Sequence, residues 1–397
     1  MKRIELLSPA GDLERLKVTL LYGADAVYIG GESYSLRANA HNFSLDEIKE
    51  GCEFAHKLGK RVHLTLNIVF HNEDMADVKK YISDVVDCGI DAFIVSDPFI
   101  ISYIKSNFDV EVHLSTQNST SNYKAIEFFE KEGIDRVVLA RELGKKEISE
   151  IIKKVNTDIE VFIHGAMCTC FSGRCALSNY VTNRDANRGG CAQVCRFSFD
   201  TSEEKEFTMA LKDMNMAEYI PDLIDIGVTS LKVEGRMRSL YYLATVIGTY
   251  REIIDRYYDG TLDESIMKVL EYRLDRVANR ETSSHYFTKR ADWTDQYYTG
   301  RSEVSNQDYL GQVICYKNNL IKFYERNYFE VGDTVEVFTP CGLHVEFKVT
   351  ELFDEDMEKV DVARHPDNIY YLKLDGDYEI PEYSMIKIVK RGKVYEK

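Results

Sequence analysis

Residues 22–29, Tyr-Gly-Ala-Asp-Ala-Val-Tyr-Ile, hold the pattern on which the prediction of the fold rests. A glycine ends a helical stretch, an aspartate follows two positions later, and a short run of β-branched and aromatic residues begins. The same order recurs at Gly89 before residues 92–95 and at Gly133 before residues 136–139. A glycine in this place caps the end of a helix and lets the chain turn into a strand. The repeated joint therefore predicts an alternation of helices and strands.

Seven short apolar runs precede residue 165, and we expect each of them to form a β-strand. They are Ile4–Leu7, Ala26–Ile29, Val62–Leu66, Ala92–Val95, Val110–Leu114, Arg136–Leu139 and Ile159–Ile163. An eighth run, Ser230–Val233, leads into a long helical stretch at Leu240–Tyr258. Strands that alternate with helices form a parallel sheet. Eight such units predict an α/β protein in which residues 1–280 form a TIM-like (β/α)8 barrel. No G-x-G-x-x-G follows the first strand, and this favours the barrel over an open dinucleotide-binding sheet.

The pattern changes after residue 302 to short alternating strands. They are Gln312–Tyr316, Leu320–Tyr324, Asp333–Phe338, Val345–Thr350 and Met385–Val389. Several short strands with glycines at the turns and no helical stretch predict a small antiparallel β-barrel domain over residues 303–397. Residues 281–302 are aromatic and irregular, and we interpret them as a linker that packs on both domains.

Polar side chains follow most of the predicted barrel strands. They are Ser8, Asp12, Arg37, Asn39, Asn42, Thr65, Asn67, Ser96, Asp97, Ser115, Gln117, Asn118, Arg141, Glu142, Glu234, Arg236 and Arg238. The active sites of such barrels lie at the C-terminal ends of the strands, so we expect these groups to surround a site. Thr65 and Asn67 interrupt an apolar strand where a side chain that contacts a ligand would face inward.

Five cysteines lie between residues 168 and 195, directly after the seventh predicted strand. Cys168, Cys175, Cys191 and Cys195 have the spacing C-x6-C, fifteen intervening residues, and C-x3-C, and Cys170 is a fifth. Clustered cysteines in a reducing compartment bind metal or carry out redox chemistry more often than they form disulfides. We therefore predict one metal site, held by an insertion at about 165–200 in which glycines let the backbone N–H groups point at sulfur.

Three kinds of site fit these cysteines. An iron–sulfur cluster takes four thiolates and tolerates irregular spacing. A structural zinc site uses pairs spaced C-x2-4-C, which only Cys191 and Cys195 match. A catalytic thiol needs one cysteine and a histidine, for which His164 is the neighbour, but it leaves the other cysteines unexplained. The spacing favours the iron–sulfur cluster, and Cys170 remains an alternative ligand to Cys168.

The composition narrows the class of protein. The net charge is −16, which argues against a broad nucleic-acid surface because phosphate binding depends on Lys and Arg, although a local basic patch remains compatible with it. No apolar run is long enough to cross a bilayer, and the start, MKRIELLSPAGD, lacks the apolar core of a signal peptide. We expect a cytoplasmic protein with no membrane contact.

Four stretches of the chain resemble one known family. They are residues 160–178, EVFIHGAMCTCFSGRCALS, residues 5–11, ELLSPAG, residues 23–30, GADAVYIG, and residues 231–236, LKVEGR. The family is named peptidase U32, and the resemblance covers essentially the whole chain. Residues 188–196, RGGCAQVCR, look most like the branch that acts on tRNA.

The resemblance implies an enzyme that hydroxylates RNA without oxygen by means of a [4Fe–4S] cluster. The cluster ligands carry over to Cys168, Cys175, Cys191 and Cys195. The implied reaction forms 5-hydroxyuridine at the wobble position of the tRNA anticodon loop, with prephenate as the hydroxyl donor. The alternatives that the family offers are hydroxylation of ribosomal RNA or another small substrate, and a collagenase-like peptidase. An accessory subunit or an electron donor is a further expected partner.

Basic and aromatic residues near the cysteines are candidates for substrate binding. Arg141, Lys212 or Arg236 would clamp a dicarboxylate donor, since the guanidinium group binds carboxylates through a two-pronged fork. The arginines that could contact RNA are Arg174, Arg184, Arg188, Arg196, Arg236 and Arg238, and the aromatic residues that could stack on a base are Tyr180, Phe197 and Phe199. The alternative is that these arginines pair with nearby acids such as Asp185 and Glu234. No H-E-x-x-H or G-x-S-x-G motif supports the peptidase.

Overall fold

A computed structural model describes residues 3–36, 42–200, 207–277, 280–298 and 308–392. The predicted strand-end residues Arg37 and Asn39 lie outside these ranges. None of the described helices is both long enough and apolar enough to cross a membrane.

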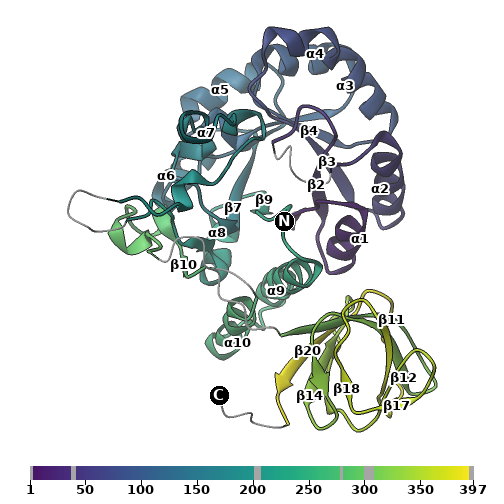
Figure 1. The fold of residues 1–397 in the computed structure, drawn as a ribbon. Helices are drawn as coiled ribbons and strands as arrows, with labels where there is room; N and C mark the ends of the chain where they lie inside the picture. Colours follow the sequence, from purple (N-terminus) through teal and green to yellow (C-terminus); the bar gives the residue numbers. More distant parts are fainter. Residues whose placement is uncertain (1–2, 37–41, 201–206, 278–279, 299–307, 393–397) are drawn as a thin grey trace.

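Eight parallel strands form a closed barrel (Figure 1). They are β1 (Glu5–Pro9), β2 (Ala26–Gly30), β3 (Arg61–Leu66), β4 (Ala92–Val95), β5 (Glu111–Leu114), β6 (Arg136–Val138), β7 (Asp158–Ala166) and β9 (Ser230–Val233). Each strand pairs with its neighbour in the chain, and β9 closes the barrel by pairing with both β1 and β7. The predicted TIM-like barrel and all eight of its predicted strands are confirmed.

Helices surround the barrel on the outside (Figure 1). They are α1 (Leu13–Leu21), α2 (Leu45–Lys57), α3 (Val78–Asp87), α4 (Pro98–Asn107), α5 (Tyr123–Lys131), α6 (Lys145–Ile152), α8 (Ile220–Asp225), α9 (Leu240–Tyr258) and α10 (Glu264–Asp275). The helix-to-strand joints use glycine as predicted: Gly23, Gly89 and Gly133 have φ values of 108°, 92° and 83°. Only glycine enters this region without steric cost, which explains its recurrence before the strands.

The cysteine-rich insertion begins at the end of β7. It contains α7 (Leu177–Thr182) and short 3-10 turns, and it returns to the barrel through β8 (Asp213–Asn215), which pairs antiparallel with the end of β7. The predicted linker range holds β10 (Thr282–Ser283), which pairs with β8. The sequence did not reveal β8 or β10, because strands of two or three residues are too short to show a pattern.

Charged side chains fill part of the barrel interior. Arg136 on β6 pairs with Glu5, and its guanidinium also lies 3.1 Å from Glu160 on β7. Lys232 on β9 donates to the other oxygen of Glu160 at 2.7 Å. Each buried charge thus has an opposite partner, which is the condition under which charges remain ionised in an interior.

The C-terminal domain is an antiparallel sheet that rolls up beside the barrel (Figure 1). Its strands follow the order β15 (His344–Lys348), β14 (Thr334–Phe338), β20 (Met385–Lys390), β11 (Tyr309–Lys317), β12 (Leu320–Glu325), β19 (Ile369–Lys373), β16 (Leu352–Phe353) and β17 (Lys359–Val360). A separate pair consists of β13 (Phe329–Glu330) and β18 (Val362–Ala363). The five predicted strands are confirmed, and the antiparallel domain with them.

Aromatic residues join the two domains. Tyr241 of α9 stacks on Tyr309 with ring centroids 5.0 Å apart. The Tyr22 hydroxyl donates to the carbonyl oxygens of Phe338 and Tyr383 at 3.2 and 3.0 Å. Phe338 and Met385 of the small domain belong to the same buried core as the barrel residues. The two domains therefore share a core.

Candidate functional site

A cavity of about 400 Å³ opens at the C-terminal ends of the barrel strands. It is lined by residues from the strands, from the loops after them and from the cysteine insertion: Tyr28, Leu36, Thr65, Asn67, Ile94, Ser115, Thr116, Gln117, Val138, Arg141, Phe162, Ala166, Met167, Cys168, Ser172, Gly173, Ala186, Gly189, Cys191, Gln193, Cys195, Arg196, Lys232, Glu234, Arg236 and Met237. The strand-end residues and the cysteines, which the sequence treats as two separate signals, therefore meet in one place.

The cysteines lie at the mouth of this cavity. Cys168, Cys191 and Cys195 line it directly. Cys191 is exposed, whereas Cys168, Cys175 and Cys195 are half-buried. Cys170 lies next to both Cys168 and Cys175, with which its thiol is hydrogen-bonded. The insertion thus presents its thiols to a space that a small molecule can enter.

Two thiols of the predicted ligand set accept backbone hydrogen bonds. The Leu177 N–H donates to Cys175 Sγ at 3.3 Å, and the Gln193 N–H donates to Cys191 Sγ at 3.4 Å. Gln193 reaches this geometry in the left-handed region, with φ at 54°. Amide N–H groups that point at sulfur stabilise anionic thiolates and are a recurrent feature of iron–sulfur sites. The chemistry of the donors thus fits a thiolate-bound cluster.

Cys168 and Cys170 have opposite tendencies to ionise. The hydrogen bond from the Cys170 thiol lowers the pKa of Cys168, and the nearby Arg141 guanidinium lowers it further. The same bond to Cys168 raises the pKa of Cys170, since its proton is held between the two sulfurs. The pair favours Cys168 as the thiolate and so as the metal ligand.

Two carboxylates of the barrel, Glu142 and Asp74, help to hold the insertion in place. Glu142, after β6, accepts from the backbone N–H of Ser172 at 2.6 Å and from its hydroxyl at 2.8 Å. Arg188 binds Asp74 through two hydrogen bonds of 2.6 and 3.0 Å. This bond from Arg188 lowers the pKa of Asp74. Because bidentate pairs fix orientation as well as distance, the loop of Cys191 has a defined position over the barrel.

Four cations line the cavity: Arg141, Arg196, Lys232 and Arg236. The guanidinium of Arg141 lies 3.8 Å from the ring centroid of Phe162 and donates to the Ala166 carbonyl oxygen at 2.8 Å. Arg236 is buried against β2, where a Cβ on Gly30 would overlap its guanidinium. A protein with a net charge of −16 thus gathers positive charge in its cavity, which favours an anionic ligand.

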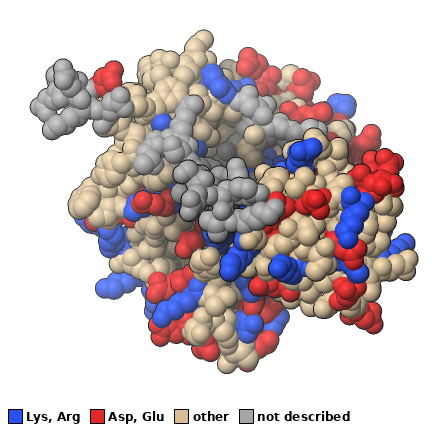
Figure 2. All heavy atoms as spheres, turned by 60° about the horizontal axis from the view of Figure 1, so that its bottom comes forward, with Lys and Arg blue, Asp and Glu red and all other residues tan. Residues whose placement is uncertain are grey.

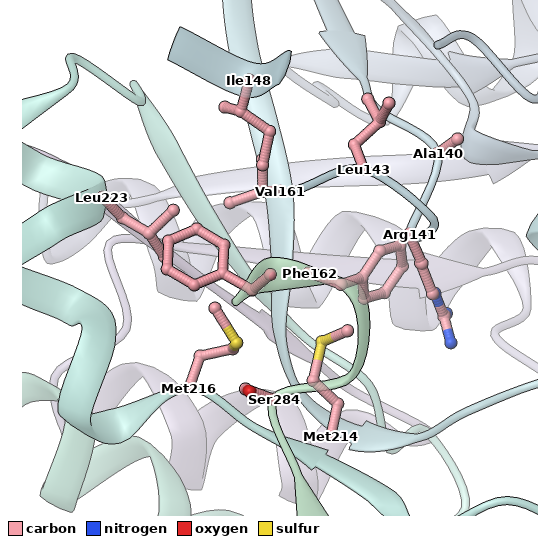
Figure 3. A pocket seen from close by; sticks show the side chains of 11 residues that line it. Ala140, Arg141, Leu143, Ile148, Val161, Phe162, Met214, Met216, Leu223 and Ser284 are labelled. Atoms are coloured by element: carbon pink, nitrogen blue, oxygen red, sulfur yellow. The ribbon is translucent and has the colours of Figure 1, made fainter. Parts of the chain in front are cut away.

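Arg141 also borders a second, small cavity of about 20 Å³. Its lining is largely apolar and includes Ile148, Leu223, Met214 and Met216. Figure 3 shows Arg141 at the edge of this group, on the side away from Ile148 and Leu223. The small cavity is about the size of one water molecule and is no substrate site.

The remaining predicted substrate residues are distributed around the site. Asn67 lines the cavity and donates to Ser115 Oγ at 3.3 Å. Lys212 is paired with Glu281 at 2.9 Å, and Arg174 donates to the Gln117 carbonyl oxygen at 2.6 Å. Neither Lys212 nor Arg174 lines the cavity, and Arg188 is occupied by Asp74.

Sequence reasoning missed Lys232 as part of the site, whereas it included Gln117 among the strand-end residues expected there. Lys232 is the middle of an apolar strand, so nothing in the sequence distinguishes it from a core position except its charge. Gln117 lines the cavity as expected, and its Oε1 is buried there without a hydrogen-bond partner among the residues that the structure describes.

Among the residues that the structure describes, no three His, Cys, Asp or Glu side chains are arranged to hold a metal ion. A cluster of four irons spreads its thiolates more widely than one ion does. The ligand set of Cys168, Cys175, Cys191 and Cys195 therefore stays a prediction.

His164 is engaged away from the cysteines. Its Nδ1 lies 3.1 Å from the Tyr250 hydroxyl, and its Nε2 is buried without a partner among the described residues. Burial lowers the pKa of His164 to about 4. Neither ring nitrogen reaches a thiol, so the described geometry offers no cysteine–histidine dyad at this residue.

A parallel (β/α)8 barrel with a cysteine-rich insertion over its cationic mouth defines a barrel enzyme whose site combines thiols with an anion pocket. The model of peptidase family U32 matches residues 11–296, and the model of the U32 C-terminal domain matches residues 305–387. The chain belongs to peptidase family U32, and it is an enzyme of that family.

Three curated relatives are similar over different lengths. "tRNA hydroxylation protein P1" of Bacillus subtilis is 44% identical over 390 residues, which cover 94% of this chain and 92% of the relative. "Collagenase" of Porphyromonas gingivalis is 33% identical over 88% of this chain and 89% of the relative. "23S rRNA 5-hydroxycytidine C2501 synthase" of Escherichia coli is 37% identical over 64% of this chain and 39% of the relative.

Proposed function

We propose that this enzyme hydroxylates a pyrimidine of tRNA, the wobble uridine of the anticodon loop, to 5-hydroxyuridine without oxygen. The single observation that carries the proposal is the similarity to tRNA hydroxylation protein P1, which spans 94% of this chain and 92% of that protein. By its name, an rRNA relative makes 5-hydroxycytidine, so both names describe the hydroxylation of RNA.

The proposed cofactor is a [4Fe–4S] cluster on Cys168, Cys175, Cys191 and Cys195. Such a cluster supplies redox equivalents when bound. Support comes from the thiols at the cavity mouth and from the two amide hydrogen bonds to Cys175 and Cys191. The role of the chain is to hold the thiolates beside the cavity and to keep the Cys191 loop on the barrel.

The proposed hydroxyl donor is a small dicarboxylate such as prephenate. Arg141 and Arg236 face the cavity and present guanidinium groups whose positions are fixed, by Phe162 in one case and by the glycine-lined end of β2 in the other. A pre-positioned guanidinium loses little side-chain entropy when it binds a carboxylate. Asn67 and Ser115 would orient the remaining polar groups of the donor.

The proposed RNA contact is the rim of the same cavity. Tyr180 is 89% exposed, and Phe171 and Met237 are also exposed near the insertion or the loop after β9. Exposed aromatic side chains on the insertion offer a surface on which an unpaired base stacks. Phe199, by contrast, stacks on Phe207. Figure 2 shows acidic and basic side chains interspersed over one face of the protein, so RNA contact is proposed only at the rim.

The competing function is a peptidase, which the name of the Porphyromonas relative favours. It needs an activated nucleophile, and His164 contacts Tyr250 rather than a cysteine. A purified protein that cleaves gelatin or casein, with cleavage abolished by Cys168→Ala, would support the peptidase.

The test of the proposed function is a chromosomal deletion complemented with wild-type or variant chain, grown without oxygen so that an oxygen-dependent enzyme cannot compensate. Transfer-RNA nucleosides are then measured by mass spectrometry. We expect 5-hydroxyuridine derivatives to disappear in the deletion strain and with Cys191→Ala, and to return with Cys341→Ala, since Cys341 lies in the C-terminal domain. Unchanged tRNA nucleosides in the deletion strain, in an organism with no second copy of the gene, would overturn the proposal.

A further inference from the structure

Lys232 occupies an unusual place for a lysine. It is 4% exposed on β9, yet it lines the barrel cavity. Its ammonium lies 4.4 Å from the ring centroid of Tyr28 and 5.7 Å from that of Phe162, both of which line the same cavity. Lys232 thus packs against aromatic rings, pairs with one carboxylate and reaches a cavity. Nucleophilic lysines have surroundings of this kind.

The partner of Lys232 is Glu160, 2.7 Å away and fully buried. Glu160 already has a second cationic partner, because the Arg136 guanidinium lies 3.1 Å from its other oxygen. Lys232 is therefore not needed merely to neutralise Glu160. Burial lowers the pKa of Lys232, an effect that the charge of Glu160 opposes. The ammonium is thus easier to deprotonate than that of an exposed lysine, while a cation at this position remains stabilised.

Two of the three other cations of the cavity indicate what kind of ligand such a lysine would meet. Arg141 and Arg236 line the same space, and Arg236 is confined by the backbone of β2 at Gly30. Guanidinium groups bind carboxylates, and an amine reacts with an aldehyde or ketone carbonyl. A ligand that satisfies all three residues carries a carboxylate and a carbonyl group together.

We propose that Lys232 forms an imine with the carbonyl carbon of a small oxo acid whose carboxylate is bound by Arg236 or Arg141. The inference rests on the proposed function only in placing a carboxylate-bearing donor in this cavity. Nucleophilic attack by Lys232 would hold that donor covalently during the reaction.

The step balances without a further reactant. The nitrogen of Lys232 forms a bond to the carbonyl carbon, and the carbon–oxygen bond breaks. Two of the three ammonium protons leave with the oxygen as water, and the third stays on the nitrogen of the protonated imine. The positive charge is therefore kept, and Glu160 remains paired throughout, which is why a buried carboxylate beside the amine favours this product.

The experiment traps the imine in full-length protein purified without oxygen. Pyruvate and phenylpyruvate are the probes, sodium borohydride reduces the imine to a stable secondary amine, and a peptide map locates the added mass. We expect one reduced adduct per chain on Lys232, formed at least tenfold faster than adducts on exposed lysines, and slowed about tenfold by Arg236→Gln, since a charge-assisted hydrogen bond is lost.

Matched variants separate this result from general lysine chemistry. Lys232→Arg keeps the charge and should abolish the adduct, whereas Lys212→Arg, outside the cavity and paired with Glu281, should leave it unchanged. An adduct on Lys232 that forms no faster than those on exposed lysines overturns the proposal. Because the wild-type peptide map alone gives this answer, a variant that fails to fold does not obscure it. The tRNA assay is independent: trapping with unchanged tRNA nucleosides would overturn the proposed function and not the imine.

Discussion

The sulfur pair Cys168 and Cys170 shows how position, rather than residue type, selects a ligand. Both are cysteines of one loop, but Cys168 lies two residues after the end of β7, and its hydrogen bond with Cys170 lowers its pKa. The thiolate and not the thiol binds metal, so the residue with the lowered pKa is the better ligand. The sequence leaves this choice open because spacing cannot tell which thiol gives up its proton.

Cys168→Ser is expected to remove most of the bound iron, whereas Cys170→Ser should keep it. The physical reason is that a serine at 168 replaces the thiolate, while a serine at 170 still offers a donor to Cys168. Iron and acid-labile sulfide per chain, together with the EPR spectrum of the reduced protein after anaerobic reconstitution, are the measurements. Equal iron in both variants would mean that the two cysteines substitute for each other.

Glu325 is a buried carboxyl group in the C-terminal domain. Neither of its oxygens has a hydrogen-bond partner among the described residues, and burial raises its pKa to about 7. When the pKa of a carboxyl group is higher in the folded state than in the unfolded state, its contribution to the free energy of unfolding is largest below the unfolded-state pKa. That contribution is lost as the pH rises to the folded-state pKa. We expect the wild type to lose stability between about pH 4.5 and pH 7 through this group.

Glu325→Gln should remove that dependence. Because the amide is neutral at every pH, the variant should exceed the wild type by about 1 kcal/mol at pH 8, where the buried carboxylate is charged, and by much less at pH 5. Chemical denaturation at the two pH values measures the difference. Equal stability differences at pH 5 and pH 8 would show that Glu325 is not protonated in the folded protein.

At the scale of elements, the repeated glycine joints and the apolar runs predicted the barrel well. β4 and β9 have the predicted bounds, as does α9, because an apolar run between clear breakers determines both of its ends. α10 begins at Glu264 because the side chain of Asp263 caps its start. The sequence indicated the strand-end residues and the cysteines separately. It did not reveal that the chain returns to the barrel through β8, which brings the cysteines to the same cavity as Arg141 and Arg236.

The position of the insertion should depend on the contact between Arg188 and Asp74. Arg188→Ala removes both hydrogen bonds to Asp74 and leaves that carboxylate partly buried. We expect the fold of the barrel to persist and the iron to be lost to a chelator about tenfold faster, because the loop of Cys191 gains freedom. Stopped-flow or manual-mixing absorbance with a chelator measures the rate. Arg184→Ala is a matched control in the same insertion, and an equal rate in the two variants would exclude an anchoring role for Arg188.

The end of β2 should control the anion pocket. Gly30→Ala places a methyl group where the Arg236 guanidinium lies, so the arginine must move. We expect the binding of a small dicarboxylate to weaken about tenfold, with iron content unchanged, since a displaced guanidinium loses its paired hydrogen bonds. Calorimetric titration with prephenate measures the affinity. Unchanged affinity in a correctly folded Gly30→Ala protein would remove Arg236 from the donor site.

At the scale of the whole molecule, the C-terminal domain packs against one side of the barrel and shares its buried core. The barrel contributes Tyr22, directly after α1, and Tyr241 of α9 to the contact, and the small domain contributes Tyr309 and Phe338. Arg276, at the end of α10, adds a two-pronged pair with Asp308, at 2.7 and 2.5 Å. An interface of packed aromatic rings and a bidentate ion pair restricts relative motion of domains, in contrast to a mobile linker.

Tyr241→Ala should therefore destabilise the protein as a whole. Removing a buried aromatic ring lowers the free energy of unfolding by about 3 kcal/mol. Both domains lose packing in this variant, because the ring stacks on Tyr309 across the domain boundary. We expect a single unfolding transition in the wild type to separate into two in the variant, observed by differential scanning calorimetry. Tyr324→Ala, on the exposed side of β12, removes the same type of side chain away from the contact and should leave one transition. Two transitions in the wild type, or one in Tyr241→Ala at the wild-type temperature, would show that the domains unfold independently of this contact.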